Sequence, residues 1–296
     1  MFKHSLTRKL FGIFGALLMA FNSFAWGPWD KGAWLRTKFL PKAAPAPYKD
    51  PLLPFIHPES QVTQAQFREL LENLSPEQRK ALWMAMKGSG KAPGRPISSQ
   101  ELEKELLRVS SHWLPLIFKK KLDYHKTVRW LAEKNDVHKA EIATASTFQL
   151  ERRIMEKIFA KLWDKLSQEQ KQKILEESGL SPSDAAGYAT LSAAALVSSL
   201  GIASAAMGFT FYIIVAKTVV VVAAFFGVSA ATTITAVAAL CGPIGWVIAG
   251  VSAVAGALLI GGPNAMKTAA FVVALHAIKA NAMQKSGIDI SQYILK

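Results

Sequence analysis

The sequence predicts an all-α protein in two unlike parts: an amphipathic helical domain, then an Ala- and Gly-rich hydrophobic helical bundle that is transmembrane. Apolar residues recur at three- and four-residue spacing over residues 63–183, and serine-based capping patterns precede them. Residues 185–288, by contrast, contain neither Asp nor Glu. A domain in water needs interspersed charge on its surface, so a carboxylate-free stretch of this length favours lipid as its solvent.

Net charge and cysteine content narrow the classes of partner. The 296 residues carry a net charge of +14, and 51% of them are hydrophobic. Such a charge attracts anionic surfaces, and the apolar second half favours lipid headgroups over nucleic acid. Zinc-ligand pairs, an aromatic RNP strand and a basic zipper region, which mark nucleic-acid-binding folds, are absent from the sequence. Cys241 stands alone, which excludes an internal disulfide.

Residues 1–25 have the pattern of a signal peptide. Three basic residues precede an apolar run over residues 10–21 and small residues at Ser23 and Ala25, so we expect cleavage before Trp26 and export to the cell envelope. The apolar run forms a helix of ~18 Å, which is short for a hydrocarbon core of ~30 Å. An uncleaved amphipathic or signal-anchor helix is the alternative.

A Pro- and Trp-rich segment, residues 26–62, predicts a linker or an extended strap lying on the next domain. The basic amphipathic helical domain follows at residues 63–183. Its first helix is predicted from the stripe Phe67, Leu70, Leu71 and Leu74, which share one helical face.

Serine caps predict where the later helices of this domain start. Capping boxes, in which Glu or Gln follows the serine by three residues, occur at Ser75, Ser98, Ser146 and Ser167, and Ser181 is followed by proline. The similarity of "LSPEQRKALW" and "LSQEQKQKIL" fits duplication or convergence on the same cap equally well. The longest stripe predicts core packing, not a cofactor site, for Leu150, Ile154, Ile158, Leu162, Trp163 and Leu166.

The remaining residues, 184–296, are predicted to be a hydrophobic helical membrane domain. Spans fit the pattern at residues 187–207, 209–230 and 243–261, and the small residues of the first would let helices approach closely in lipid. An amphipathic helix over residues 267–285 would follow along the interface or pack back on the bundle. The alternative is a water-soluble protein in which the apolar helices form a buried hairpin and insert only on a trigger.

Five residues of this half are membrane or hinge candidates: Lys217, Gly242, Pro243, Gly262 and Pro263. Lys217 lies near the middle of the second span, where a lysine costs about 2.5 to 3.5 kcal/mol on the insertion scale. It would snorkel, face a water-filled space or mark the turn of a hairpin. The two Gly-Pro pairs bracket the third span, and each predicts a turn and a hinge.

The densest basic cluster is a candidate membrane-facing surface. It combines Lys119, Lys120 and Lys121 with Lys126 and Arg129. Each basic residue near an anionic membrane adds about 1 kcal/mol of attraction. A solvated helix face is the alternative.

Three stretches resemble a known family. "VRWLAEKNDV" and "STFQLERRIMEKIFAKLWDKLSQEQKQKIL", and more distantly "GGPNAMKTAAFVVALHAIK", are similar to the YaaW-like family of uncharacterised bacterial proteins, over a range from about Phe67 to Lys279. The resemblance implies a helical fold but no activity, and the chain has Gln149 where the family has Glu. The family is loosely grouped with ubiquinol-cytochrome c assembly chaperones.

No residue pattern predicts catalysis, a cofactor or a metal. His112, His125 and His138 are spaced by thirteen residues, which does not return them to one helical face. A phosphate-binding loop, a dinucleotide fingerprint and a nucleophile elbow are absent from the sequence. An enzyme is therefore the weakest hypothesis, and its turnover would depend on Asp123, His125 or Glu151.

Two function hypotheses from different classes follow. The first is a non-enzymatic protein of the inner membrane, with its helical domain in the periplasm, whose partner is the lipid bilayer and which inserts into it or forms a pore. The second is an assembly chaperone that holds a membrane-protein client. A homo-oligomer is compatible with both. Deletion of residues 185–296 is expected to separate the two hypotheses.

Overall fold

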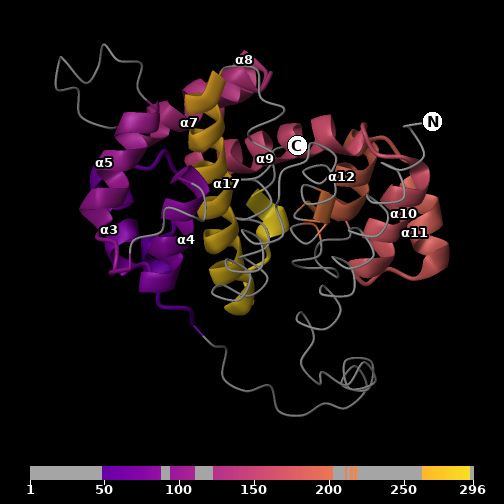
Figure 1. Ribbon diagram of the computed structural model, residues 1–296, viewed down its shortest axis with the longest axis horizontal. Helices are drawn as coiled ribbons and strands as arrows, with labels where there is room; N and C mark the ends of the chain where they lie inside the picture. Colours follow the sequence, from indigo (N-terminus) through magenta and orange to yellow (C-terminus); the bar gives the residue numbers. More distant parts are fainter. Residues whose placement is uncertain are drawn as a thin grey trace, which may run out of the picture. The chain divides into compact units, whose positions relative to one another are not determined.

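All regular secondary structure in the described part of the chain is helical, as the sequence predicts. The computed structural model describes residues 49–87, 94–110, 123–202, 211, 214, 215, 217, 218 and 262–293 (Figure 1). These residues belong to one compact unit. Its helices are α3 (Gln64–Asn73), α4 (Pro76–Lys87), α5 (Ser99–Ser110), α7 (Tyr124–Lys134), α8 (Lys139–Thr144), α9 (Thr147–Trp163), α10 (Gln168–Glu177), α11 (Pro182–Ala189), α12 (Ala193–Ile202) and α17 (Gly262–Lys285), with 3-10 turns η2 (Leu53–Phe55) and η4 (Ile290–Tyr293).

The predicted serine caps begin the helices that follow them. At the start of α9, Ser146 Oγ accepts a hydrogen bond of 3.2 Å from the Gln149 N–H, and the Gln149 side chain accepts one of 2.9 Å from the Ser146 N–H. The same reciprocal pair starts α10 at Ser167. Each box satisfies two backbone donors that the first helical turn leaves without a partner. Local chemistry therefore fixes where these helices begin.

Both predicted apolar stripes of the amphipathic domain are buried. Phe67 and Leu71 in α3 and Ile154 and Leu162 in α9 have no exposed surface. The remaining members, Leu70, Leu74, Leu150, Ile158, Trp163 and Leu166, are also buried. The prediction that these stripes form core is confirmed.

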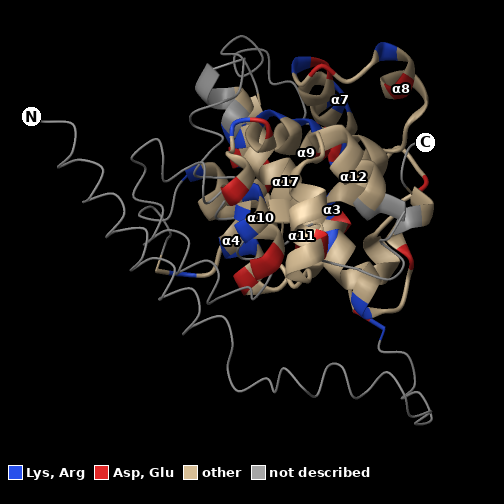
Figure 2. Cartoon of the chain, turned by 90° about the vertical axis from the view of Figure 1, so that its right-hand side faces the viewer, with Lys and Arg blue, Asp and Glu red and all other residues tan. Residues whose placement is uncertain are grey.

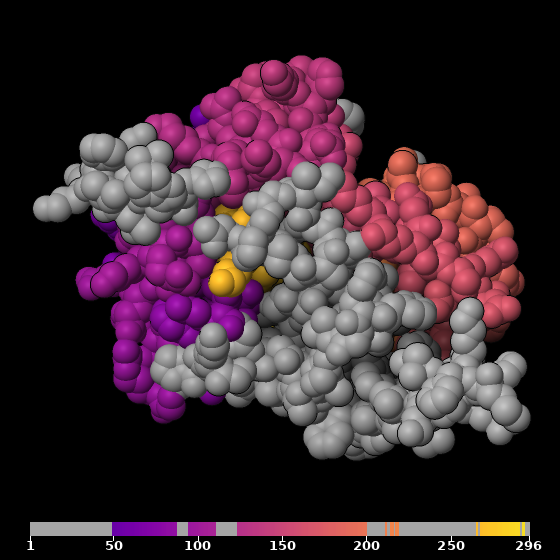
Figure 3. All heavy atoms as spheres, turned by 45° about the horizontal axis from the view of Figure 1, so that its top comes forward, coloured from indigo at the N-terminus to yellow at the C-terminus, as the bar shows by residue number. Residues whose placement is uncertain are grey.

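Helix α17 lies at the centre of the unit, and the prediction of an amphipathic helix there is wrong. Every residue from Thr268 to Ala280 is at most 3% exposed, so this part of the helix has no solvent-facing side. It packs against α4, α5, α7 and α9 (Figure 1). Figure 3 shows only a small yellow area of the C-terminal residues on the face it draws. A mostly apolar helix that is covered on all sides belongs in a protein core or in a membrane, and here α4, α5, α7 and α9 cover it.

The first predicted span, residues 187–207, is not one helix. α11 ends at Ala189 and α12 begins at Ala193. Between them Thr190 Oγ1 donates a hydrogen bond of 2.7 Å to the Gly187 carbonyl, and Ser192 Oγ accepts one of 3.3 Å from the Ala195 N–H. The Ser192 side chain thus takes the Ala195 N–H as its hydrogen-bond donor, as an N-cap does, and a second helix starts there. Figure 2 shows α12 without any charged residue.

No helix among the described residues combines the length and the hydrophobicity that a membrane crossing requires. Of the second span, only Phe211, Ile214, Val215, Lys217 and Thr218 are described, and the third span, residues 243–261, lies outside the described residues. Gly242 and Pro243 lie outside them as well.

The second Gly-Pro pair starts a helix. Gly262 and Pro263 are the first two residues of α17. Proline suits the first turn of a helix because the N–H it lacks would have no partner there.

Residues 49–62, the described end of the predicted linker, lie as a strap on the helices. Ser146 Oγ donates a hydrogen bond of 2.7 Å to the Pro58 carbonyl, and the Thr147 N–H donates one of 3.1 Å to the Ser60 carbonyl. The side chains that the strap buries are Leu52, Ile56 and Val62. The start of α9 thereby caps its own backbone and holds the strap.

Candidate functional site: a buried polar centre

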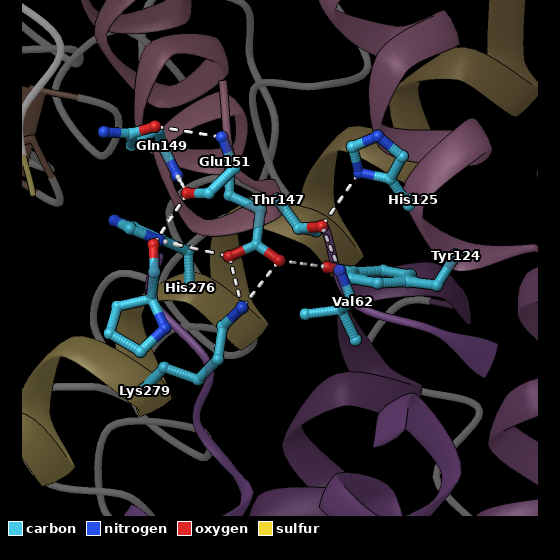
Figure 4. Close-up of polar contacts among 10 residues, drawn as sticks. Val62, Tyr124, His125, Thr147, Gln149, Glu151, His276 and Lys279 are labelled. Atoms are coloured by element: carbon cyan, nitrogen blue, oxygen red, sulfur yellow. Dashed lines mark hydrogen bonds and ion pairs between the residues drawn. The ribbon is translucent and has the colours of Figure 1, made fainter. Parts of the chain in front are cut away.

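Four ionisable or hydroxyl side chains meet in the interior, and we call them the polar centre: Tyr124, Glu151, His276 and Lys279 (Figure 4). Tyr124 is the first residue of α7, and Glu151 lies in the second turn of α9. His276 and Lys279 are three residues apart on α17 and therefore share a face. None of the four is more than 3% exposed.

Glu151 is the acceptor that joins the other three. Its Oε1 accepts hydrogen bonds of 2.7 Å from the Tyr124 hydroxyl and 2.6 Å from Lys279 Nζ. Its Oε2 forms an ion pair with Lys279 and lies 3.3 Å from His276 Nδ1. An ionised carboxylate only accepts, so Nδ1 of His276 carries the hydrogen of this contact. One carboxylate thus ties α9 to α7 and to α17.

Burial and charge set the protonation of the centre. Burial alone would raise the pKa of Glu151, but Lys279 and His276 outweigh it and hold that pKa below its usual range. Burial, reinforced by Glu151, raises the pKa of Tyr124 well above its usual value. Burial lowers the pKa of His276, with Glu151 opposing it. At neutral pH the centre therefore holds an ionised carboxylate, a neutral imidazole and a neutral phenol that donates a hydrogen bond to the carboxylate.

A second hydrogen-bonded group lies beside the centre, around Thr147 (Figure 4). Thr147 Oγ1 accepts a hydrogen bond of 2.8 Å from the Val62 N–H and lies 2.8 Å from His125 Nδ1. The Nε2 atom of His125 is buried and has no hydrogen-bond partner in the described part of the chain. Burial, together with Arg129, lowers the pKa of His125. Thr147 and Glu151 are one turn apart on α9, so the strap and the polar centre share one helix face.

Aromatic rings form the walls of the centre. The ring of His276 lies 4.5 Å from that of Phe148, and Lys279 Nζ lies 5.5 Å from the same ring. At the Tyr124 end of the centre, the Tyr124 ring stacks on the ring of Phe67, with the ring centroids 4.1 Å apart. The low polarity of these walls strengthens the ion pair and raises the cost of any unpaired charge.

Two of the ion pairs outside the centre bear on the predicted membrane half and on the surroundings of Glu151. Arg152 Nε bonds to Glu156 at 2.9 Å, with both side chains buried. Lys217 Nζ donates to the Glu177 backbone carbonyl and lies 3.5 Å from the Glu177 carboxylate. The carbonyl end of a helix attracts a cation, so the last residue of α10 suits this ammonium. The candidate membrane lysine therefore has a partner within the protein.

Two of the five residues of the predicted basic surface are described. Lys126 is exposed and lies 3.2 Å from Asp123, the N-cap of α7, while Arg129 is half-buried on the same helix. Lys119, Lys120 and Lys121 lie outside the described residues. A membrane-facing role for the cluster stays a prediction.

The sequence gives a signal for three members of the polar centre, but not for their pairing. Glu151 was an enzymatic candidate, and a carboxylate one residue after Leu150 and three before Ile154 sits on an apolar stripe, which is an unusual position. His276 and Lys279 are among the few ionisable residues of the apolar half. Their pairing with Glu151 was missed because it crosses more than a hundred residues. In the described part of the chain no group of His, Cys, Asp and Glu residues has the geometry of a metal site.

Comparisons with known proteins add nothing to this geometry. No family model matches the chain, and neither a curated protein nor a solved structure matches it. The resemblance to the YaaW-like family stays a prediction.

Proposed function

We propose that the protein is a non-enzymatic, membrane-associated helical protein whose charged amphipathic helices carry an apolar C-terminal half that acts on a lipid bilayer. The observation that carries the proposal is the absence of Asp and Glu from residues 185–288. The basic side chains in that range are few, and the net charge of the chain is +14. A lipid bilayer with anionic headgroups accounts for both features: its interior suits the stretch without carboxylates, and its surface attracts the positive charge.

The pairing of Lys217 with Glu177 supports a conditional form of this proposal. In the folded unit the ammonium lies against a carboxylate and a helix end. In a bilayer it would lose both partners, and a lysine at the centre of a membrane helix costs about 2.5 to 3.5 kcal/mol. We therefore propose that the apolar half is carried folded against the amphipathic helices and reaches the bilayer only when that packing opens.

The arrangement of the polar centre supports a role without catalysis. A catalytic acid or base needs contact with a substrate, whereas Glu151 is fully buried and engaged with three donors of the protein itself. Such a site holds helices together. Turnover that depends on Glu151, Asp123 or His125 would contradict this part of the proposal.

Vesicle flotation of the full-length chain tests the membrane role. We expect the protein to float with vesicles of phosphatidylcholine and phosphatidylglycerol, and the bound fraction to resist carbonate while detergent extracts it. Lys217→Met should raise the inserted fraction, roughly a hundredfold in the insertion equilibrium from ~3 kcal/mol. Lys104→Met, at an exposed position of α5, is the matched control and should change it little. Protein that stays unbound at every lipid composition and pH would contradict the proposal.

The assembly-chaperone hypothesis needs a test other than truncation. Deletion of residues 185–296 removes α17, the helix that α4, α5, α7 and α9 surround, so the fragment would lose its core. The full-length chain must be used. Suppression of the aggregation of a membrane-protein client without any binding to vesicles would favour the chaperone over the bilayer proposal.

Sequencing of the mature N-terminus on the same sample tests export, with Trp26 expected as the first residue.

A further inference from the structure

The core contains two nitrogen bases that face a single carboxylate. His276 and Lys279 on α17 both contact Glu151 on α9, and the charged groups that act on His276 are Glu151, Lys279 and Arg152. Arg152 is itself paired with Glu156. From α7, Tyr124 bonds to Glu151 and His125 lies next to Thr147. Within the described residues, the carboxylate that contacts both bases is Glu151 alone.

Protonation of His276 changes the net charge of the polar centre. At neutral pH one carboxylate faces one ammonium, and a protonated His276 adds a second cation at a position without exposed surface. A second positive charge beside one buried carboxylate is costly to hold. The pKa of His276 in the folded chain lies below its ordinary value of 6.5, so the unfolded or opened chain takes up the proton first. The contribution of the neutral His276 to the free energy of unfolding is therefore fully present above pH 6.5. It is lost as the pH falls through the folded-state pKa.

We propose that the polar centre is an acid-sensitive lock: protonation of His276 releases α17 from Glu151 and Tyr124, and the helix then offers its apolar surface to a lipid bilayer. This inference rests on the membrane role proposed above and gives it a trigger. The helix is suited to the task because almost its entire surface between Thr268 and Ala280 is buried and apolar. The ionisable residues on that surface are His276 and Lys279, and the other side chains carry no charge.

Flotation of the full-length protein at pH 7.5 and pH 5.0, with vesicles of phosphatidylcholine and phosphatidylglycerol, tests the lock. Vesicle-bound protein should rise at pH 5.0, since one proton of difference changes an opening equilibrium by up to about tenfold per pH unit below 6.5. His276→Gln, which cannot take up a proton, should lose the larger part of this rise. His138→Gln replaces an exposed histidine and should keep the full acid response.

Circular dichroism and urea unfolding at both pH values are measured on the same samples, so that a misfolded variant is recognised. His125→Gln provides the second test: it should retain the larger part of the acid response, because His125 contacts Thr147 and not the Glu151 pair. If His125→Gln abolishes the response and His276→Gln leaves it, the assignment to His276 is wrong. If His276→Gln does not fold, an acid-induced loss of stability in the wild type that His125→Gln abolishes would overturn the proposal, and one that it retains would support it.

The outcomes separate the lock from the membrane role. Equal vesicle binding at both pH values would overturn the lock and leave the membrane role standing. Acid opening that depends on His276, without binding to any vesicle, would support the lock and overturn the membrane role. Unchanged stability between pH 7.5 and 5.0 together with no vesicle binding would overturn both.

Discussion

Glu151→Gln should lower the free energy of unfolding of the full-length protein by about 3 to 5 kcal/mol at pH 7.5. The amide keeps the size of the side chain and an acceptor for the Tyr124 hydroxyl, but it leaves the ammonium of Lys279 without its counter-charge in a site where that side chain is 4% exposed. Lys279→Met should be comparably destabilising, because it strands the carboxylate instead. Urea unfolding followed by circular dichroism measures both losses.

The double variant Glu151→Gln with Lys279→Met isolates the pair. Removing both charges should recover most of the stability, since replacing a whole buried ion pair is often neutral while breaking one is costly. Glu141→Gln is the matched control, because its carboxylate pairs with Arg153 at a partly exposed site. It should cost less than about 1 kcal/mol. A Glu151→Gln loss no larger than that of the control would show that the ion pair does not hold α17.

Trp163→Ala should lower the free energy of unfolding by about 3 to 5 kcal/mol through the cavity it leaves. The indole is fully buried, lies 5.3 Å from the ring of Phe159, and donates a hydrogen bond of 3.3 Å to the Leu191 carbonyl. That bond links the end of α9 to the break between α11 and α12. The loss of the tryptophan should therefore loosen α12, which packs on α9.

Trp163→Phe separates the ring from the hydrogen bond. Phenylalanine retains most of the buried area but leaves the Leu191 carbonyl without this donor, so we expect a loss of about 1 to 3 kcal/mol. Thermal unfolding monitored by near-UV circular dichroism compares the two variants. Equal losses would mean that the hydrogen bond, and not the packing, determines the effect.

Helix starts and amphipathic stripes could be predicted because they depend on neighbours in the sequence. Ser146 and Gln149 bond to each other within one turn, and the α9 stripe repeats every three or four residues. The break at residues 190–192 follows from the same chemistry, since Ser192 precedes an alanine run as a cap does. In the sequence that signal was outweighed by the hydrophobicity of the surrounding residues.

The position of α17 could not be predicted, because it depends on contacts between distant residues. Its Ala, Val and Phe residues are equally compatible with a lipid environment and with a protein core, and periodicity does not distinguish the two. The structure decides it through Glu151, which lies 128 residues from Lys279. Likewise, Lys217 has the pattern of a lysine inside a span, and only its approach to Glu177, 40 residues away, shows its partner.

Hydrogen exchange measured by mass spectrometry on the full-length protein, at pH 7.5 and without lipid, tests most directly whether α17 is the locked central helix. Peptides covering residues 268–283 should exchange as slowly as the α9 peptides, since amides in the core open only with the whole unit. Peptides from the short helix α8 should exchange far sooner. Exchange of residues 268–283 within seconds, while α9 stays protected, would contradict the account, because α17 would then not be held by the polar centre.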